Sequence, residues 1–170
     1  AMSALSNKLN GHSGNDELRT PGYLWDWLNR RFAFSLDAAA SHENARCAEY
    51  CTADGYFERD DIGPIQQGTE DGLTISWQDF RVFLNPPYSR PLLGQFIEKA
   101  IAERDRAEII VMLVKCDTST ENYRRLAANA HIEHLSRVRY LGPDGGPIRD
   151  KNGKPVSATF ASCIAIIRPT

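Results

Sequence analysis

The alternation of apolar and polar positions along the chain predicts four helices. The first is expected to begin at Thr20, as the N-cap, with Pro21 at the first helical position. Apolar residues at helical spacing mark this helix: Leu24, Trp25, Leu28 and Phe32. The other helices are expected over residues 43–51, 91–105 and about 120–128.

Continuous apolar runs predict the strands of a sheet. The run Ile109–Val114 is β-branched and suits a central strand that is buried on both faces. The other strands are expected over residues 34–37, 81–84, 132–135, 137–141 and 159–167. This order predicts an α/β fold, with a mostly parallel sheet and an antiparallel C-terminal edge. Ligands of such sheets bind beyond the carboxyl ends of the strands, where Asp37 and Asn85 are expected.

The length of 170 residues suits one folded domain. We expect this domain to cover residues 17–170, after a flexible tail over residues 1–16. Residues 52–76 are acidic and contain several glycines, which predicts a long loop that is functional or mobile. No apolar run approaches the ~20 residues of a membrane span, and no secretory signal is visible. The sequence therefore favours a cytoplasmic location.

Metal binding is not expected from the sequence. His42, Cys47 and Cys51 lie close together, but Cys-x3-Cys with one nearby His lacks a second pair of zinc ligands. Packing of small buried side chains is the interpretation we favour for the cysteines.

Charge is unevenly distributed along the chain. The net charge is −2, which argues mildly against a protein that binds nucleic acid. Residues 37–80 hold ten acidic and two basic side chains, whereas residues 115–170 hold five acidic and nine basic ones. The simplest interpretation is charge scattered over solvated surfaces, but the basic surplus in the last third leaves an anionic partner possible.

Asn85-Pro86-Pro87-Tyr88 is the most informative motif. Two prolines after an apolar strand cannot continue a ladder; they fix φ at two positions and restrict Asn85. The loop therefore holds an amide, a carbonyl and an aromatic ring in a fixed relation. This suits a planar substrate with an NH2 group. The Asn85 oxygen and the Pro86 carbonyl can each accept a hydrogen bond from this group, while Tyr88 stacks on the flat face of the substrate. A rigid turn without chemistry is the alternative.

The motifs together resemble those of the phage-type DNA N6-adenine methyltransferases, which share the Asn-Pro-Pro-Tyr motif of amino-methyltransferases that use S-adenosylmethionine (SAM). The resemblance covers about residues 16–168. The segments that carry it are, in order, Asp16–Pro21, Leu36–Ser41, Asp71–Leu73 with Trp77, Phe83–Ser89, Leu113–Thr120 and Arg137–Tyr140. As a set these motifs are specific, whereas each one except Asn-Pro-Pro-Tyr is weak.

The resemblance implies a Rossmann-like, three-layer SAM-dependent methyltransferase fold. Thr20 and Pro21 would lie near the methionine end of SAM, and Asp37 would pair with its amino group. Ala38 and Ala39 would let the cofactor approach the backbone closely. The Gly-rich motif common among SAM enzymes is absent, as it is in this family.

The implied reaction is direct displacement: the adenine amine takes the methyl group from the sulfonium of SAM and S-adenosylhomocysteine leaves. It requires neither a metal nor a nucleophilic side chain. Asn85, which would also border SAM, and the Pro86 carbonyl would stabilise the positive charge that grows on nitrogen. The loop is stiffened by Pro87. A base in duplex DNA cannot reach such a pocket, so the adenine would flip out and stack on Tyr88.

DNA contact is expected mainly from a turn-rich hairpin over residues 142–157, although this hairpin could also be merely solvated. Phosphate contacts would make affinity depend on salt and give little sequence specificity. The candidate contacts are Ser89, Arg90, Arg139, Arg149, Lys151 and Lys154. The sequence indicates no obligate protein partner, and a phage or prophage protein would act in the cytoplasm of its bacterial host.

Other acceptors with a planar amino group remain open: adenine in RNA, cytosine N4 and protein glutamine. Against protein glutamine stand the missing Gly-rich motif and the missing recognition domain. A further alternative is a phage protein that binds DNA without catalysis, which the intact Asn85 and Tyr88 argue against.

Overall fold

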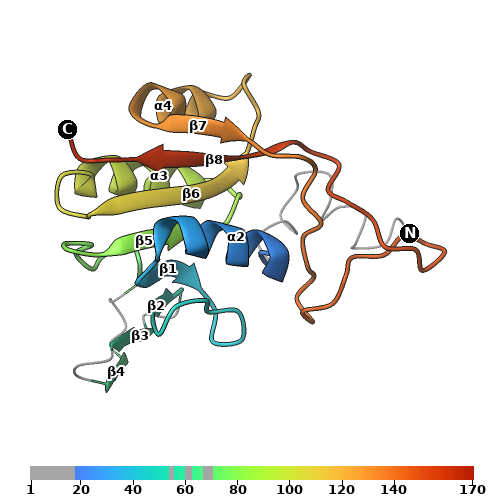
Figure 1. The fold of residues 1–170 in the computed structure, drawn as a ribbon, viewed down its shortest axis with the longest axis horizontal. Coiled ribbons are helices and arrows are strands. Elements are labelled where there is room, and N and C mark those ends of the chain that lie inside the picture. The colour runs from blue at the N-terminus through green and yellow to red at the C-terminus, as the bar shows by residue number, and fades with distance from the viewer. Residues whose placement is uncertain (1–17, 54–55, 60–62, 67–70) are drawn as a thin grey trace.

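A single mixed β-sheet with helices on both faces forms the core of the protein (Figure 1). The computed structural model describes residues 18–53, 56–59, 63–66 and 71–170, with only the backbone course for the two short stretches. The helices are α2 (Gly22–Phe32), α3 (Leu92–Glu103) and α4 (Glu121–Asn129). The strands are β1 (Leu36–Ala40), β2 (Glu49–Thr52), β3 (Tyr56–Arg59), β4 (Gly63–Gln66), β5 (Arg81–Leu84), β6 (Ile109–Lys115), β7 (His131–His134) and β8 (Ser162–Ile167).

The strand order in the sheet is β4-β3-β2-β1-β5-β6-β8-β7. The central strands β2, β1, β5 and β6 are parallel. Antiparallel pairs flank them on both sides, β3 and β4 at one edge and β8 and β7 at the other. The predicted α/β fold with an antiparallel C-terminal edge is confirmed. Because β1, β5 and β6 are parallel, their carboxyl ends meet at one edge of the sheet, which we call the carboxyl edge.

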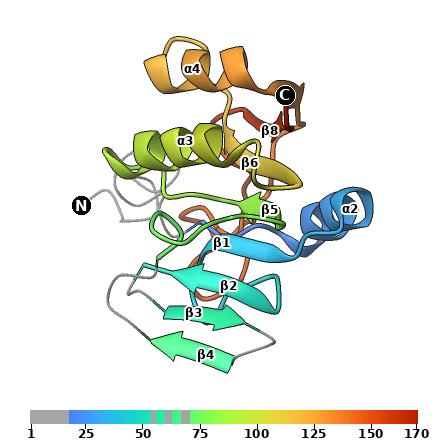
Figure 2. The ribbon, with the colours of Figure 1, turned by 90° about the vertical axis from the view of Figure 1, so that its left-hand side faces the viewer.

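Helix α2 lies on one face of the sheet and α3 on the other (Figure 2), and each face carries a separate apolar cluster. Side chains alternate along β6, so that Met112 packs toward α3 and α4 whereas Val111 packs toward α2. All residues of β8 and all but the last residue of β6 are buried, as expected for strands covered on both faces. The central sheet is therefore a rigid support for the loops at its carboxyl edge.

The predicted helices over residues 91–105 and 120–128 are confirmed as α3 and α4. Thr120 caps α4 by accepting a hydrogen bond from the backbone N–H of Tyr123. The prediction for α2 was wrong in one respect. Pro21 is the N-cap, without a side-chain hydrogen bond, and the Thr20 hydroxyl instead contacts Asn85.

Two further predictions are corrected by the structure. Residues 43–51 do not form a helix: a turn in which Ser41 O accepts from the N–H groups of Asn44 and Ala45 leads into β2. The segment 52–76 is not one long loop, because it contains the antiparallel pair β3–β4. The predicted tail over residues 1–16 lies outside the described residues.

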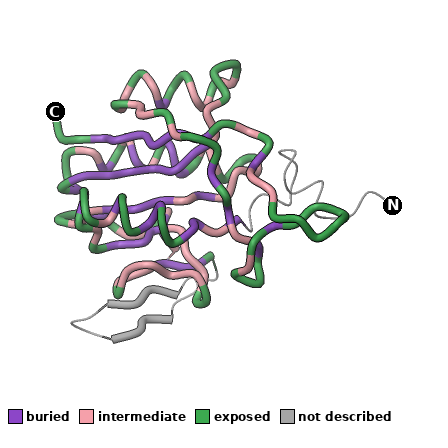
Figure 3. Tube along the Cα trace, turned by 45° about the vertical axis from the view of Figure 1, so that its right-hand side comes forward, coloured by how far each residue is buried: buried purple, intermediate pink, exposed green. Residues whose placement is uncertain are grey.

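The chain between β7 and β8, residues 135–161, extends from the carboxyl edge (Figure 1). The predicted strand over residues 137–141 is absent; Leu141 instead makes isolated bridges to Arg19 and Pro147. The 142–157 hairpin is exposed over most of its length (Figure 3). In the described part of the chain, no helix is long and apolar enough to cross a membrane.

Candidate active site

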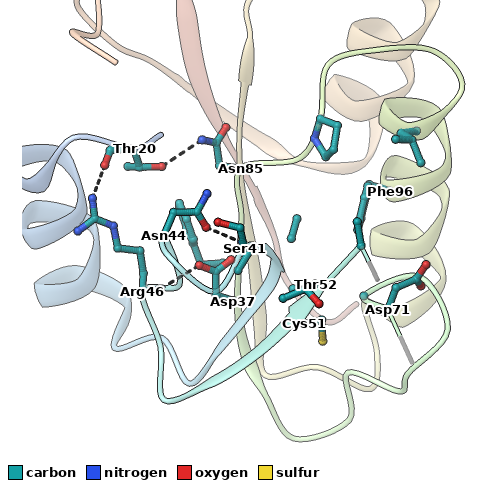
Figure 4. Close-up of a pocket in the computed structure, with 18 of the residues that line it drawn as sticks. Thr20, Asp37, Ser41, Asn44, Arg46, Cys51, Thr52, Asp71, Asn85 and Phe96 are labelled. Carbon is teal, nitrogen blue, oxygen red and sulfur yellow. Dashed lines mark hydrogen bonds between the residues drawn. The ribbon is translucent and has the colours of Figure 1, made fainter. Parts of the chain in front are cut away.

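A cavity of about 410 Å³, which we call the main cavity, opens at the carboxyl edge, beside the ends of β1 and β5 (Figure 4). Its volume is within the range of small-molecule and cofactor pockets. Six of the predicted site residues line it: Thr20, Asp37, Ala38, Ala39, Asn85 and Pro87. Apolar walls come from side chains that include Leu92 and Phe96 of α3. The structure thus brings together residues from the start of the chain, β1 and the Asn-Pro-Pro-Tyr loop.

Asp37 is the buried carboxylate of this cavity, with an exposed fraction of 3%. Its Oδ2 accepts a hydrogen bond of 3.1 Å from the backbone N–H of Arg46, but its Oδ1 has no partner among the described residues. Burial raises the pKa of Asp37 to about 6, although the backbone N–H groups of Arg46 and Ala39 and the Arg46 charge oppose this. The cavity therefore contains an acceptor that a cationic or N–H donor on a ligand would satisfy.

Arg46 links this carboxylate to Thr20 (Figure 4). Its guanidinium donates to the backbone oxygen of Thr20, while its backbone N–H holds Asp37. The sequence analysis missed Arg46. The available signal was a basic residue in the loop after the strand that carries Asp37, but a contact across 26 residues cannot be inferred from spacing.

The carboxamide of Asn85 is held in one orientation. Its Nδ2 donates to Leu18 O at 3.0 Å and to Thr20 Oγ1 at 3.2 Å. A backbone carbonyl only accepts, so the NH2 group must face Leu18 and the oxygen must face away from it. That oxygen accepts a hydrogen bond of 3.2 Å from the Tyr88 hydroxyl.

Tyr88 lies beyond Asn85 and does not line the main cavity. Its hydroxyl is within hydrogen-bond distance of Leu113 O and the Tyr140 hydroxyl, and burial raises its pKa well above the usual value. The Lys115 ammonium lies 5.4 Å from the centre of the Tyr88 ring and 4.6 Å from that of Phe160. Phe160 was not predicted; it adds a second aromatic ring beside the motif.

A turn at Asp71–Trp77 closes the cavity from the side of α3. Trp77 donates from Nε1 to Gly72 O at 3.0 Å, and Asp71 Oδ1 accepts from the backbone N–H of Leu73 at 2.9 Å. A Cβ on Gly72 would lie 1.8 Å from Ala38 O. Only glycine lets this turn approach β1 so closely, which explains why Gly72 and Trp77 occur together.

Replacement of Gly72 by alanine is expected to lower the free energy of unfolding by about 2 kcal/mol, because a backbone oxygen cannot yield to the added methyl group. Chemical denaturation of the wild type and G72A checks this. Gly22→Ala is a matched control, since a Cβ there meets no atom within 4 Å. Equal stability of G72A and the wild type would contradict the close approach.

The predicted DNA-contacting residues are separate from the main cavity. Arg90 lines a second cavity of about 430 Å³ between the ends of α3 and α4, next to Tyr88. Arg139, Lys151 and Lys154 are exposed, while Arg149 is exposed and donates to Gly153 O within its own turn. Ser89 is half-buried and accepts from the backbone N–H of Leu93 through its carbonyl.

Two further predicted site residues are buried prolines. Pro21 is buried at the start of α2, and Pro86 is buried directly after Asn85; neither lines the main cavity. Among the described residues, no group of three His, Cys, Asp or Glu side chains could hold a metal ion.

Comparison with known proteins identifies the family. The family model "DNA N-6-adenine-methyltransferase (Dam)" matches residues 8–170. The chain belongs to this family. A DNA N-6-adenine-methyltransferase of Haemophilus phage HP1 is 28% identical over 149 residues, which cover 84% of this chain and 76% of the phage protein. A DNA N-6-adenine-methyltransferase of Escherichia phage T1 is 32% identical over 114 residues, 65% of this chain and 40% of the phage protein.

Membership of the DNA N6-adenine methyltransferase family confirms the resemblance drawn from the motifs. The matched range includes the cavity residues, the Asn-Pro-Pro-Tyr loop and the hairpin at the carboxyl edge. The individual roles of these residues are a separate question.

Proposed function

We propose that this DNA N6-adenine methyltransferase binds SAM in the main cavity and presents the flipped adenine to Asn85 and the Pro86 carbonyl. The observation that carries this proposal is the convergence of Asp37 and Asn85 on one cavity, with the Asn85 oxygen facing away from Leu18. When bound, SAM supplies a methyl group that is already activated on a sulfonium. The protein then needs to align and stabilise rather than to provide a nucleophile.

The residues of the cavity fit SAM. The unpartnered Oδ1 of Asp37 is a buried acceptor that suits the ammonium of the methionine part. Thr20 lies on the opposite wall, and Ala38 and Ala39 present small side chains where the cofactor approaches β1. Leu92 and Phe96 offer apolar surface for the adenosine.

The amino group of the target adenine is best placed beyond Asn85. Its two hydrogens can be accepted by Asn85 Oδ1 and the Pro86 carbonyl, which draws the nitrogen lone pair toward the methyl donor. As positive charge grows on the nitrogen, these two oxygens stabilise it. Tyr88 and Phe160 supply aromatic surface for a base that has left the duplex.

The test is to incubate the protein with SAM and adenine-unmethylated duplex DNA, digest the DNA and weigh the nucleosides. We expect N6-methyldeoxyadenosine among the nucleosides. Detection of N4-methylcytosine instead would show that the protein methylates cytosine and not adenine. No DNA product with SAM still bound would turn attention to RNA or protein glutamine, and neither product nor SAM binding would favour a DNA-binding protein without catalysis.

We place DNA on the carboxyl edge, against the exposed 142–157 hairpin. The hairpin leaves the same edge as the main cavity, and its basic residues are exposed. Phosphate contacts there would hold the duplex while the base enters the site, with little direct readout of sequence. Because the matched relatives are phage proteins, we place the reaction in a bacterial cytoplasm.

Replacement of Arg149, Lys151 and Lys154 by glutamine is expected to weaken DNA binding and its dependence on salt. Each lost phosphate contact reduces the slope of log K against log salt by about 0.9, so the slope should fall by about 2–3. Titration of labelled duplex at several salt concentrations measures this. A matched control replaces Arg30, Arg106 and Arg168, which are exposed at the opposite edge of the sheet. An unchanged slope in the hairpin variant would remove the hairpin from the interface.

A further inference from the structure

The orientation of the Asn85 carboxamide depends on groups outside the motif. Its NH2 group is held by Leu18 O and Thr20 Oγ1, and its oxygen is held by the Tyr88 hydroxyl. Rotation of the amide by half a turn would place the oxygen against Leu18 O, where two acceptors would face each other. The orientation that presents an acceptor to the target base is therefore enforced from both ends.

The Tyr88 hydroxyl is itself part of a chain of hydroxyl groups. It lies 3.4 Å from the Tyr140 hydroxyl, which lies 2.9 Å from Ser162 Oγ. Tyr140 and Ser162 are almost fully buried, with exposed fractions of 2% and 0%. Burial raises the pKa of Tyr140 to about 12 and raises that of Tyr88 well above its usual value, so both phenols are protonated at neutral pH.

The direction of the hydrogen bonds follows from the partners. Two neighbours of the Tyr88 hydroxyl, Asn85 Oδ1 and Leu113 O, can only accept, so Tyr88 must donate to one of them. The Tyr140 hydroxyl is the neighbour that can donate to Tyr88, and Ser162 can in turn donate to Tyr140. When Tyr88 donates to Asn85 Oδ1, the chain runs as donors from Ser162 through Tyr140 and Tyr88 to Asn85.

The two ends of this arrangement are also connected through the backbone. Arg19 and Leu141 exchange hydrogen bonds of 2.9 and 3.0 Å. Arg19 lies between the two residues that hold the Asn85 NH2 group, and Leu141 follows Tyr140. These two hydrogen bonds connect the segment that holds the Asn85 nitrogen with the segment that supports the Asn85 oxygen.

We infer that Tyr140 and Ser162 are positioning residues for methyl transfer, which hold the Asn85 oxygen toward the target base through the hydroxyl of Tyr88. This rests on the proposed function, because it assumes that Asn85 accepts from the adenine amino group. The Asn85 oxygen has two lone pairs, so it can accept from the Tyr88 hydroxyl and from the target amino group at the same time.

The test compares Tyr140→Phe with the wild type in steady-state methylation and in side-chain amide NMR. Y140F keeps the buried ring but removes one hydroxyl. We expect kcat to fall about tenfold, the effect of one lost hydrogen bond, while the KM for SAM stays within about twofold. The Asn85 side-chain amide signals, assigned from their loss in Asn85→Ala, are expected to shift or broaden.

Tyr123→Phe is the matched control. Its hydroxyl is half-buried on α4 and accepts from Cys116 Sγ, outside the chain that leads to Asn85. We expect kcat and the Asn85 signals to stay unchanged in this variant. A second test is Tyr88→Phe with Y140F: the double variant should be no slower than Y88F alone, because both changes break one chain.

The outcomes separate this inference from the proposed function. If the wild type methylates adenine but Y140F retains its kcat, or loses it without movement of the Asn85 signals, the positioning role is overturned and the proposed function stands. If the wild type does not methylate DNA, the proposed function fails and the inference falls with it. If Y140F does not fold, Ser162→Ala replaces it, with a smaller expected decrease of kcat of about threefold.

Discussion

Replacement of Asn85 by alanine is expected to lower kcat for adenine methylation by a factor of 10² to 10³, the usual effect of removing one preorganised group that stabilises transition-state charge. The variant loses the oxygen that faces away from Leu18 and accepts from Tyr88. It also loses the amide that ties the motif to Leu18 and Thr20. Single-turnover methylation with saturating SAM measures the effect on the chemical step.

The binding of SAM should change much less than kcat in this variant. Asn85 borders the main cavity, but the charged partner we assign to the cofactor is Asp37. We therefore expect SAM to raise the melting temperature of this variant, because it retains the residue that we assign to the cofactor. Asn129→Ala is a matched control on α4, where the side chain donates only to Arg125 O of its own helix. Near wild-type methylation by N85A would remove Asn85 from the catalytic step.

Replacement of Asp37 by asparagine is expected to weaken SAM binding about 100-fold and, at the same time, to stabilise the protein without SAM. The loss of affinity follows from removing the charge that pairs with the methionine ammonium. The gain in stability follows from burial: the pKa of Asp37 is raised from 3.8 to about 6, so its charge destabilises the fold at pH 7. That difference corresponds to about 3 kcal/mol, an upper limit for the gain.

The raised pKa of Asp37 makes both the free energy of unfolding and the affinity for SAM depend on pH. Between about pH 4 and pH 6 the folded protein holds a proton on Asp37 that the unfolded chain has released, so the free energy of unfolding falls as pH rises. SAM prefers the ionised carboxylate, so its affinity should rise through about pH 6. Denaturation and calorimetric titration across this range measure both trends.

In D37N both trends should be absent, whereas Asp26→Asn, an exposed change on α2, should leave them as in the wild type. A D37N protein that binds SAM as tightly as the wild type would show that the carboxylate does not hold the cofactor. Lower stability of D37N at pH 7 would show that the unpartnered Oδ1 does not carry the expected energetic cost.

The best sequence predictions were those that depend on local pattern. The apolar stripe of α3, the continuous apolar run of β6 and the position of Asn85 directly after a strand all appear in the structure. In each, the residues that decide the outcome lie within about ten positions of one another. The Thr120 cap of α4 is local in the same way.

The failures involve contacts between distant parts of the chain. Residues 43–51 have a composition that favours a helix, but β2 gains backbone hydrogen bonds by pairing with β1, and Asp37 needs the N–H of Arg46. Thr20 resembles an N-cap, yet its hydroxyl accepts from Asn85, 65 residues away. Such partners are set by topology, which spacing alone does not reveal.

The position of β8 in the sheet has a consequence for synthesis of the chain. This strand, residues 162–167, pairs with β6 on one side and β7 on the other, so it lies inside the sheet although it is translated after every other strand. Until it leaves the ribosome, β6 has one open edge and the Tyr140 hydroxyl lacks Ser162. The described residues that line the main cavity all lie between residues 18 and 96, so they are synthesised well before Ser162. The hydroxyl chain that supports the Asn85 carboxamide is therefore completed later in synthesis than the residues of the cavity.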